Sequence, residues 1–237
     1  MLVVGFDTET TGVDVTKDTI VQVGLVLWDT SAKVKKSKLK YDALLRGAPP
    51  MDQEVIDIHG ITDADLEEYG EDPKKVFGLM HDICMGADAI IAHNGNGFDK
   101  PMYLENCTRL GIAPIDKLWI DTMCDIEYPV RIQTRKLTHL AAEHGFLNPF
   151  PHDAISDVLT MLKIADQYDW DKTVLWAQTP SIVVQACVTF HEKELAKAQQ
   201  YRWNAPDKTW VKTIKSFQLE EVQKAAADAG FKIVVKG

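Results

Sequence analysis

Two acidic residues, two positions apart, follow an apolar run at the start of the chain. The run is Leu2-Val3-Val4, and the acids are Asp7 and Glu9. A β-strand turns alternate side chains to one face, so both carboxylates should point the same way. Two desolvated carboxylates this close repel each other unless a cation lies between them. Oxygen ligands suit Mg²⁺ or Mn²⁺ better than Zn²⁺. The alternative is a strand that ends in a polar, threonine-rich turn.

Composition and charge narrow the function classes. The chain has 237 residues, of which 46% are hydrophobic, enough for one large domain or a medium domain and a small one. Its net charge of −9 argues against a protein that simply coats nucleic acid. The charge is uneven, at −12 for residues 1–181 and +3 for residues 182–237. An acidic body joined to a mildly basic tail suits an enzyme that acts on a polyanion.

Cysteine spacing and hydropathy indicate the cellular compartment in which the protein is expected. The cysteines form no Cys-x-x-Cys pair, which predicts reduced, mostly buried thiols and argues against zinc bound through sulfur. No apolar run approaches the ~20 residues of a membrane span. The apolar start has neither a basic flank nor a cleavage site, so we expect no signal peptide and a cytoplasmic protein. The four cysteines are Cys84, Cys107, Cys124 and Cys187.

Hydrophobic periodicity predicts an antiparallel meander followed by alternating helices and strands. Three apolar, β-branched segments come first, and the third has a lysine-rich start, which we interpret as a solvated edge strand rather than a phosphate-binding patch. The alternation after them indicates an α/β fold with a mixed central sheet flanked by helices. The expected strands are 2–7, 19–28, 33–46, 87–92 and 118–120; the expected helices are 52–58, one from 72, 98–110, 136–144 and 153–168.

The pattern changes after residue 166, which predicts a second, smaller domain. We expect a first domain at residues 1–172, a linker at 173–181 and a small α+β domain at 182–237. Its expected elements are a strand at 182–190, a helix at 192–200, a hairpin at 202–214, a helix at 219–229 and a strand at 232–235.

Three further residues are placed where they can complete a metal site. Asp99 follows a short strand and a glycine turn, at the sheet edge where open α/β sheets bind ligands. His152 and Asp157 are five positions apart, so one helix would not point both the same way. With His152 in the loop before the helix and Asp157 on it, both can face one centre. Asp121 is a further candidate, for which a helix N-cap is the simpler interpretation.

Three motifs in this order resemble a known nuclease family. They are Phe-Asp-Thr-Glu-Thr-Thr-Gly from Phe6, Asn-x-x-x-Phe-Asp from Asn94 and His-x-x-x-x-Asp from His152. Together they resemble the histidine subgroup (DEDDh) of the DEDD exonuclease superfamily, which includes proofreading subunits, exonuclease X, ribonuclease T and oligoribonuclease. The segment Ile58-His59-Gly60-Ile61-Thr62 is also similar to a recurrent family segment. The resemblance covers roughly residues 1–170.

The resemblance implies a fold, a reaction and a set of roles. The fold would be ribonuclease H-like, and the reaction would be hydrolysis of phosphodiesters at a 3′ end with two Mg²⁺ or Mn²⁺ ions, releasing 5′-mononucleotides. His152 would be the general base, since an imidazole titrates near neutral pH. Asn94 would contact the nucleotide or only form the turn. The implied metal ligands are Asp7, Glu9, Asp99 and Asp157; the implied substrate contacts are Thr8, Thr10, Thr11, Gly12, His59, Ile61 and Asn94.

The tail is similar to a small domain appended to phage and plasmid enzymes that act on DNA. Trp203 and Trp210 should form a cross-strand pair in a hairpin. One alternative is that they stack on bases, with phosphates held by the cations Arg202, Lys208, Lys212 and Lys215. Another is that the tail docks on the first domain or on a partner such as a replication protein.

Taken together, the sequence predicts a 3′–5′ exonuclease of DNA repair or replication that acts on single-stranded or frayed 3′ ends of DNA. The alternatives are an exoribonuclease that trims RNA ends, a proofreading subunit attached to a DNA polymerase, and a non-catalytic nucleic-acid binder. We expect no membrane partner.

Overall fold

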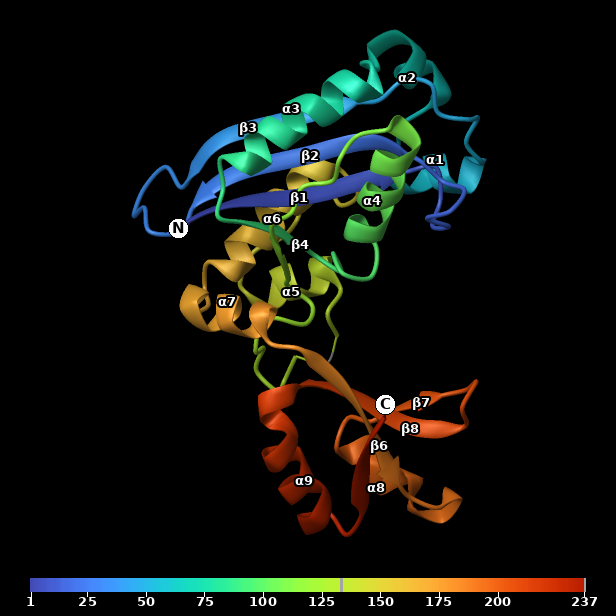
Figure 1. The fold of residues 1–237 in the computed structure, drawn as a ribbon, viewed down its shortest axis with the longest axis vertical. Coiled ribbons are helices and arrows are strands. Elements are labelled where there is room, and N and C mark those ends of the chain that lie inside the picture. Colours follow the sequence, from blue (N-terminus) through green and yellow to red (C-terminus); the bar gives the residue numbers. More distant parts are fainter. Residues whose placement is uncertain (133, 237) are drawn as a thin grey trace. The chain divides into compact units, whose positions relative to one another are not determined.

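A five-stranded mixed sheet forms the centre of the larger of two units (Figure 1). The computed structural model describes residues 1–132 and 134–236. The N-terminal unit is Met1–Ala177 and the C-terminal unit is Gln178–Gly237. In the larger sheet the order is β3-β2-β1-β4-β5; β1, β2 and β3 pair antiparallel, whereas β4 and β5 run parallel to β1. Its strands are β1 (Leu2–Thr10), β2 (Ile20–Asp29), β3 (Ser37–Leu44), β4 (Ala89–Ala92) and β5 (Leu118–Asp121).

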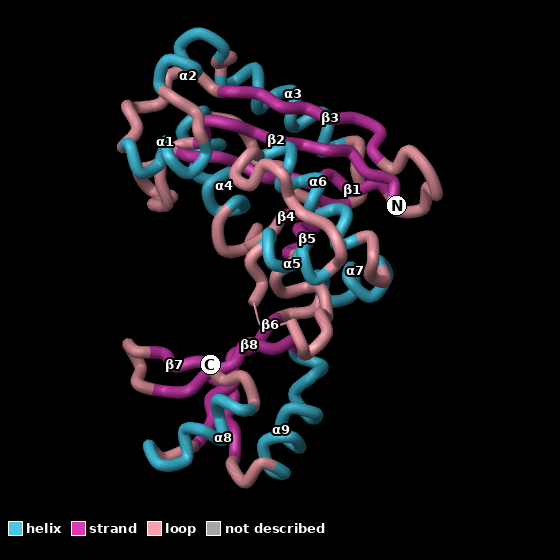
Figure 2. Tube along the Cα trace, turned by 180° about the vertical axis from the view of Figure 1, so that it is seen from behind, coloured by secondary structure: helices cyan, strands magenta, loops and turns pink. Residues whose placement is uncertain are grey.

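Helices cover both faces of this sheet, which makes a three-layer α/β unit (Figures 1 and 2). One core packs α3 and α4 against side chains such as Phe6 and Leu25. The other packs α5, α6 and α7 against side chains such as Val3 and Ile91. The predicted α/β fold with a mixed sheet is thereby confirmed. The helices are α1 (Gln53–His59), α2 (Asp63–Tyr69), α3 (Pro73–Met85), α4 (Asp99–Leu110), α5 (Leu137–Glu143), α6 (Ala154–Ala165) and α7 (Trp170–Gln178).

Two glycines let α6 lie directly on the sheet. A Cβ at Gly24 on β2 would be 2.6 Å from the carbonyl carbon of Ala154, and a Cβ at Gly5 on β1 would be 2.6 Å from Cγ1 of Val158. Real Cβ atoms do not approach other atoms this closely, so a side chain at either position would push the helix away. These two contacts therefore let α6 lie closer to the sheet than side chains at positions 5 and 24 would allow.

Two helices and one boundary differ from the sequence predictions. Helix α2 was not expected, and α7 occupies most of the predicted linker at 173–181. Helix α2 buries only Leu66, so its sequence lacks an apolar stripe; its start is instead fixed by a capping box between Thr62 and Asp65. The third strand begins at Ser37 rather than at residue 33, because a turn with Lys35 in the left-handed region precedes it.

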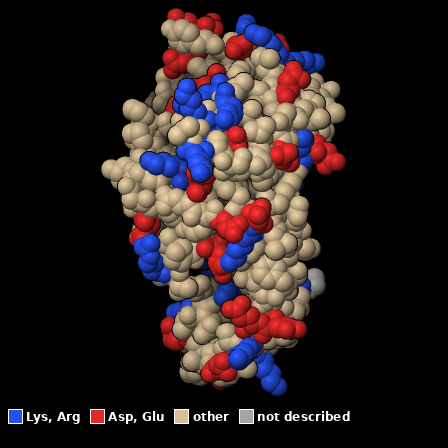
Figure 3. Space-filling model, turned by 90° about the vertical axis from the view of Figure 1, so that its left-hand side faces the viewer, with Lys and Arg blue, Asp and Glu red and all other residues tan. Residues whose placement is uncertain are grey.

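The lysines near β3 lie at the edge of the sheet, as predicted. Lys36 pairs with Asp166 at 2.7 Å, and Lys38 with Asp29 at 3.5 Å. On the face drawn in Figure 3, Lys and Arg side chains are interleaved with Asp and Glu. These pairings favour a role in protecting the edge strand over a role in binding phosphate.

The C-terminal unit is a four-stranded antiparallel sheet with the order β7-β8-β6-β9. Two helices join its strands in the sequence strand-helix-strand-strand-helix-strand, the split βαβ arrangement. The predicted small α+β domain is confirmed. Its elements are β6 (Ser181–Cys187), the 3₁₀ turn η1 (Phe190–Glu192), α8 (Lys193–Ala198), β7 (Arg202–Asn204), β8 (Thr209–Lys215), the 3₁₀ turn η2 (Ser216–Gln218), α9 (Leu219–Asp228) and β9 (Lys232–Lys236).

Packing in this unit shows how its tryptophans and lysines are engaged. Trp203 and Trp210 face each other across β7 and β8, with ring centroids 5.6 Å apart, so the predicted cross-strand pair is confirmed. Lys212 donates to the carbonyl of Gln199, and burial lowers its pKa. Lys215 is only 6% exposed and donates to a backbone carbonyl. Both lysines are therefore engaged with backbone carbonyls, and the alternative that places Lys212 and Lys215 on phosphates stays a prediction.

The cysteines only partly match the expectation of buried thiols. Cys84 and Cys107 are buried, whereas Cys124 and Cys187 are exposed. Among the described residues, no helix combines the length and the apolar character that crossing a membrane requires.

We predict that Gly24→Ala destabilises the protein more than Gly5→Ala. The new methyl at position 24 meets backbone atoms of α6, whereas the one at position 5 meets ends of the Val158 and Leu162 side chains, which can shift. Overpacking of this kind costs about 1–3 kcal/mol. Urea unfolding of the two variants gives the comparison; equal losses, or a larger loss for Gly5→Ala, would contradict the contact we assign to α6.

Candidate active site

The two acids of β1 point toward α6, as strand periodicity predicts. Asp7 lies opposite Gly24 in the β1–β2 ladder, and Gly5, on the same face of β1, contacts α6. Residues two apart on a strand share a face, so Glu9 lies on this side as well. Glu9 is 9% exposed, at the end of the strand. The absence of a side chain at Gly24 leaves the space over this part of the sheet to α6.

Asp99 reaches the site from the opposite layer. It is the first residue of α4 and is 2% exposed. The Thr8 hydroxyl donates to its Oδ1 at 3.0 Å, which ties it to β1 between the two acids of that strand. The preceding turn is held by Asp121, whose carboxylate accepts from the backbone amides of Asn94 and Asn96. Asp121 therefore positions the turn that delivers Asp99.

His152 and Asp157 meet through a sharp backbone turn. Asp157 lies in the first turn of α6, and His152 lies in the loop before it, as predicted. His152 has a φ of 63°, in the left-handed region, and its backbone amide donates to Oδ2 of Asp157 at 3.2 Å. The Asn148 amide donates to the other oxygen of the same carboxylate. Asp157 is thus oriented by two donors, and the sequence analysis did not identify Asn148.

Three of the predicted residues offer ligand atoms around one point. One atom each from Glu9, His152 and Asp157 lies within 4.8 Å of the others. Asp7 and Asp99 are close enough for their charges to interact with each other and with Glu9. The five residues therefore converge from β1, α4 and the segment that leads into α6. Four carboxylates and one imidazole are a donor set that fits hard divalent cations.

The carboxylates of this cluster resist ionisation. Burial, together with the charges of Asp157 and Asp99, raises the pKa of Glu9 to about 8. Burial raises the pKa of Asp99 to about 7, although the bond from Thr8 opposes the shift. The pKa of Asp7 is also raised well above its usual range, first by burial and then by the charge of Asp99. The charges that raise the pKa of Asp7 and Glu9 are those of neighbouring carboxylates, and a bound metal ion would relieve this repulsion.

His59 lies beside the cluster. It ends α1, and its Nδ1 accepts from the backbone amide of Ile61 at 3.0 Å. Burial lowers its pKa, and its ring is near Thr10 and His152. Ile61 is 9% exposed and packs in a small core under α1 and α2. The structure therefore brings the His59 segment to the edge of the acid cluster.

The threonines after the first acid are engaged with the protein itself. The Thr10 hydroxyl donates to the Gly12 carbonyl at 2.6 Å, and the Thr11 hydroxyl donates to Asp18 at 3.1 Å. The carboxylate of Asp18 packs on Gly12, where a Cβ would be 2.5 Å from its Oδ2. These residues shape the turn after β1, and their predicted substrate contacts stay predictions. Asn94, with a φ of 65°, is a turn residue whose carbonyl accepts from Gly97 and Phe98.

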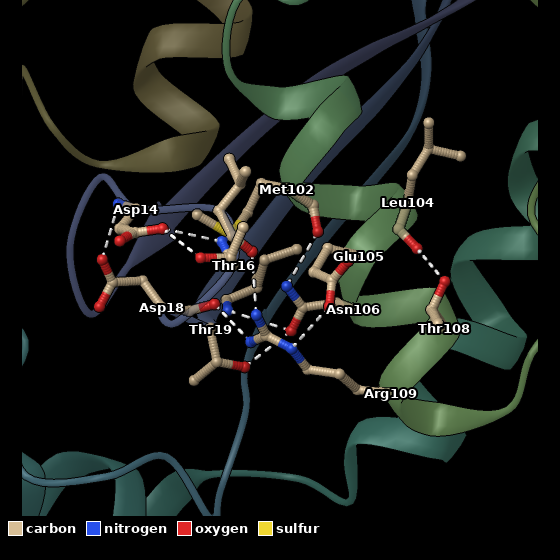
Figure 4. Close-up of polar contacts among 12 residues, drawn as sticks. Asp14, Thr16, Asp18, Thr19, Met102, Leu104, Glu105, Asn106, Thr108 and Arg109 are labelled. Atoms are coloured by element: carbon tan, nitrogen blue, oxygen red, sulfur yellow. Dashed lines mark hydrogen bonds and ion pairs between the residues drawn. The ribbon is translucent and has the colours of Figure 1, made fainter.

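A network from α4 holds the loop that follows this turn (Figure 4). The Arg109 guanidinium donates to the carbonyls of Asp18 and Val15 at 2.6 and 2.9 Å. Asn106 is buried, accepts from the Thr19 hydroxyl at 2.7 Å and donates back to the carbonyl of Met102. The helix that begins with Asp99 therefore also holds the β1–β2 loop in place. Local sequence patterns do not predict this contact, because the two segments are far apart in the chain.

Comparison with known proteins gives the same picture. The family model described as Exonuclease (RNase_T) matches residues 4–165. DNA polymerase III PolC-type of Listeria welshimeri is 27% identical over 156 residues, and the protein of Listeria monocytogenes is 26% identical over the same length. Each alignment covers 64% of this chain and 10% of the polymerase, so the chain spans about a tenth of the length of these curated relatives.

Solved structures share the fold. The zinc-bound E. coli ExoI–ssDNA complex superimposes with a TM-score of 0.60 and 19% identity, over 70% of this chain and 39% of that one. The nuclease domain of 3′hExo, a DEDDh family member bound to rAMP, gives a TM-score of 0.57 and 18% identity, over 70% of this chain and 90% of that one.

The family model covers more than half of the chain, and this chain therefore belongs to the exonuclease family. The ribonuclease H-like fold that the sequence predicted is confirmed, and this chain shares it with exonuclease structures such as that of 3′hExo, a DEDDh family member.

We predict that Glu9→Gln stabilises the metal-free protein at pH 8 but not at pH 5. With a folded-state pKa of about 8, Glu9 keeps a proton that the unfolded chain releases above its ordinary pKa of ~4.3. The stability of the wild type in EDTA should therefore fall as the pH rises through this window, and the glutamine should remove part of that fall. Melting temperatures at both pH values measure the effect.

The matched control for this prediction is Glu54→Gln on α1, an exposed glutamate outside the cluster. Its melting temperature should differ from that of the wild type by the same small amount at pH 5 and pH 8. A constant difference for Glu9→Gln as well would show that the acid cluster is not under electrostatic strain.

We predict that Arg109→Ala loosens the β1–β2 loop. The substitution removes both bonds to the loop carbonyls, so limited proteolysis should cleave within residues 13–18 faster than in the wild type. Glu105→Gln is the control, because it removes only the 3.4 Å ion pair of Glu105 with Arg109. Equal cleavage rates for wild type and Arg109→Ala would show that the loop is held without the arginine.

Proposed function

We propose that this chain hydrolyses single-stranded DNA from its 3′ end with two Mg²⁺ or Mn²⁺ ions and releases 5′-mononucleotides. The observation that carries the proposal is the convergence of four carboxylates and one exposed histidine from three separate segments. A purely structural acid cluster would be expected to recruit lysine or arginine partners. Among the described residues, the donors to these carboxylates include a hydroxyl, a side-chain amide and backbone amides, which orient the oxygens without neutralising them.

Asp7, Glu9, Asp99 and Asp157 would hold the ions. Once bound, such ions lower the pKa of water and stabilise the attacking and leaving oxygens of an in-line displacement at phosphorus. The protein's part is geometric: Thr8 fixes the rotation of Asp99, and Asn148 with the His152 amide fixes that of Asp157. Fixed carboxylates need no reorganisation when the reaction begins.

His152 would accept the proton of the attacking water. Its ring is exposed in the loop before α6, so it can meet a water molecule beside the substrate. Its ring nitrogen lies within the 4.8 Å group that contains oxygens of Glu9 and Asp157. The left-handed backbone at residue 152 directs the backbone amide to Asp157, so base and ligand are set by one turn.

The choice of DNA rests on two relatives. The PolC-type proteins are DNA polymerases, and the ExoI structure is a complex with ssDNA. RNA 3′ ends are the second candidate, because 3′hExo is bound to rAMP. A proofreading role beside a polymerase is the third, since the matched tenth of the PolC-type protein is part of a DNA polymerase. Hydrolysis of matched 5′-labelled DNA and RNA strands separates the first two, and co-purification with a polymerase tests the third.

We predict that His152→Asn lowers kcat on a 5′-labelled single strand about 10²–10⁴-fold, the usual worth of a general base. Asparagine tolerates the left-handed backbone and should keep the fold and the bond to Asp157. His139→Asn on α5 is the control, as it replaces an exposed histidine outside the site. Activity within threefold of the wild type for His152→Asn would exclude the histidine as the base.

The same assay tests the proposed function as a whole. A ladder that shortens from the 3′ end of DNA in Mg²⁺ or Mn²⁺, and stops in EDTA, is the expected result. A ladder on RNA alone would move the substrate to RNA. The absence of a ladder on both, with intact melting curves, would overturn the proposed function.

A further inference from the structure

Within the described residues of the C-terminal unit, the core that α8 and α9 form with the sheet lies on one of its two faces. Core residues of α8 and α9 pack with Val184, Ala186 and Ile214. Because side chains alternate along a strand, the odd-numbered residues of β6 and β8 and the even-numbered residues of β7 and β9 point to the other side. We call these residues the bare sheet face. Thr213 and Cys187 on it are exposed, and Val234 is 49% exposed.

Charge is divided between the two faces. Among the described residues of the four strands, no Asp or Glu occupies the bare sheet face, which carries four cations. Five of the six Asp and Glu residues of the unit lie instead in the helical segments. The sixth, Asp207 in the β7–β8 turn, pairs with Lys236 at 2.5 Å. The cations of the bare sheet face are Arg202, Lys215, Lys232 and Lys236.

Two of these cations remain available to a ligand. Lys215 is buried and Lys236 is paired, whereas Arg202 and Lys232 are exposed. Neither Arg202 nor Lys232 has an ion-pair partner within residues 1–132 and 134–236. Arg202 lies on β7 and Lys232 on β9, which are the two edge strands of the sheet. The positive charges therefore flank the face from both sides.

An uncharged surface lies between the two cations. One register row crosses all four strands from Arg202 through Val211 and Gln185 to Val234, a distance of three strand spacings or about 14 Å. The middle offers small apolar side chains with an amide and a hydroxyl beside them. The described side chains of this face include no aromatic ring, so bases could not stack on it as they do on many RNA-binding sheets. Contacts to a strand would fall on phosphates and sugars.

We propose that the bare sheet face binds the sugar–phosphate backbone of single-stranded nucleic acid, as a second site besides the acid cluster. The occupant follows from the charge complementarity: a face with cations at both edges and no carboxylates matches a polyanion that is long enough to cross the sheet. Binding through phosphates is sequence-independent and weakens strongly with salt. A strand held at two sites on one protein gains affinity beyond either contact alone. The proposal goes beyond the hydrolytic function of the N-terminal unit.

The test measures binding of the full chain to a fluorescein-labelled dT20 strand by anisotropy, in EDTA so that no hydrolysis occurs. The variant Arg202→Gln/Lys232→Gln removes the two available cations. Its affinity should fall several-fold at low salt, and the slope of log K against log salt should become shallower by about 1.4, the value for two lost phosphate contacts on a single strand.

The matched control is Lys193→Gln/Lys224→Gln, which removes the same charge from the helices α8 and α9. It should keep the wild-type affinity and slope. A second variant, Thr213→Glu, places a negative charge on the bare sheet face at an exposed position without removing a cation, and it should also weaken binding. Melting curves confirm that each variant is folded, and Thr213→Glu keeps the proposal testable if the double variant does not fold.

Three outcomes would overturn the proposal. They are wild-type affinity in the folded sheet-face variants, an equal loss in the helix-side control, and no binding of dT20 by the wild type. The anisotropy assay measures binding and does not depend on catalysis. A protein that binds dT20 through this face but hydrolyses no substrate would therefore contradict the proposed function and support this inference. A protein that hydrolyses DNA with no effect of the sheet-face variants would do the reverse.

Discussion

The contact between α6 and two glycines of the sheet is the constraint on which the site depends. Gly5 and Gly24 remove the side chains that would hold the helix at an ordinary helix–sheet distance. Asp157 on α6 thereby comes close to the acids of β1, and Asp7 lies directly opposite Gly24 in the ladder. Because the two glycines lack side chains, the helix carboxylate of Asp157 can lie close to the two carboxylates of β1. The packing of the core and the geometry of the site therefore depend on the same contacts.

Bringing these carboxylates together destabilises the folded protein, and the packing of the surrounding structure compensates for this. Burial and mutual repulsion hold the pKa of Glu9 near 8 and that of Asp99 near 7. Neutral hydrogen-bond donors such as Thr8 and Asn148 orient the carboxylates but do not neutralise their charge. Two apolar cores, one on each side of the sheet, supply the stability that keeps these groups together. The residues that stabilise the fold are therefore different from the carboxylates that are positioned to bind a cation.

Periodicity revealed more of the site than of the architecture around it. A two-residue spacing was enough to place Asp7 and Glu9 on one face, and the five-residue spacing was enough to separate His152 from the helix of Asp157. Helix α2 escaped prediction because a capping box, not an apolar stripe, defines it. Asn148 was not predicted because its hydrogen bond to Asp157 depends on the path of a loop. The hydrogen bonds of Arg109 to the β1–β2 loop were not predicted because they join segments 91 residues apart. Such contacts leave no periodic trace in a sequence.

The left-handed backbone at His152 also limits how this position can change over time. Few residues with a side chain accept a φ of 63°, and asparagine and aspartate are the main ones besides glycine. A chain that drifts away from hydrolysis while keeping its fold should therefore replace the histidine with an unbranched residue that tolerates this backbone, most readily one of these three, and not with a β-branched residue. The residue found at this one position would then distinguish relatives that degrade nucleic acid from relatives that only bind it.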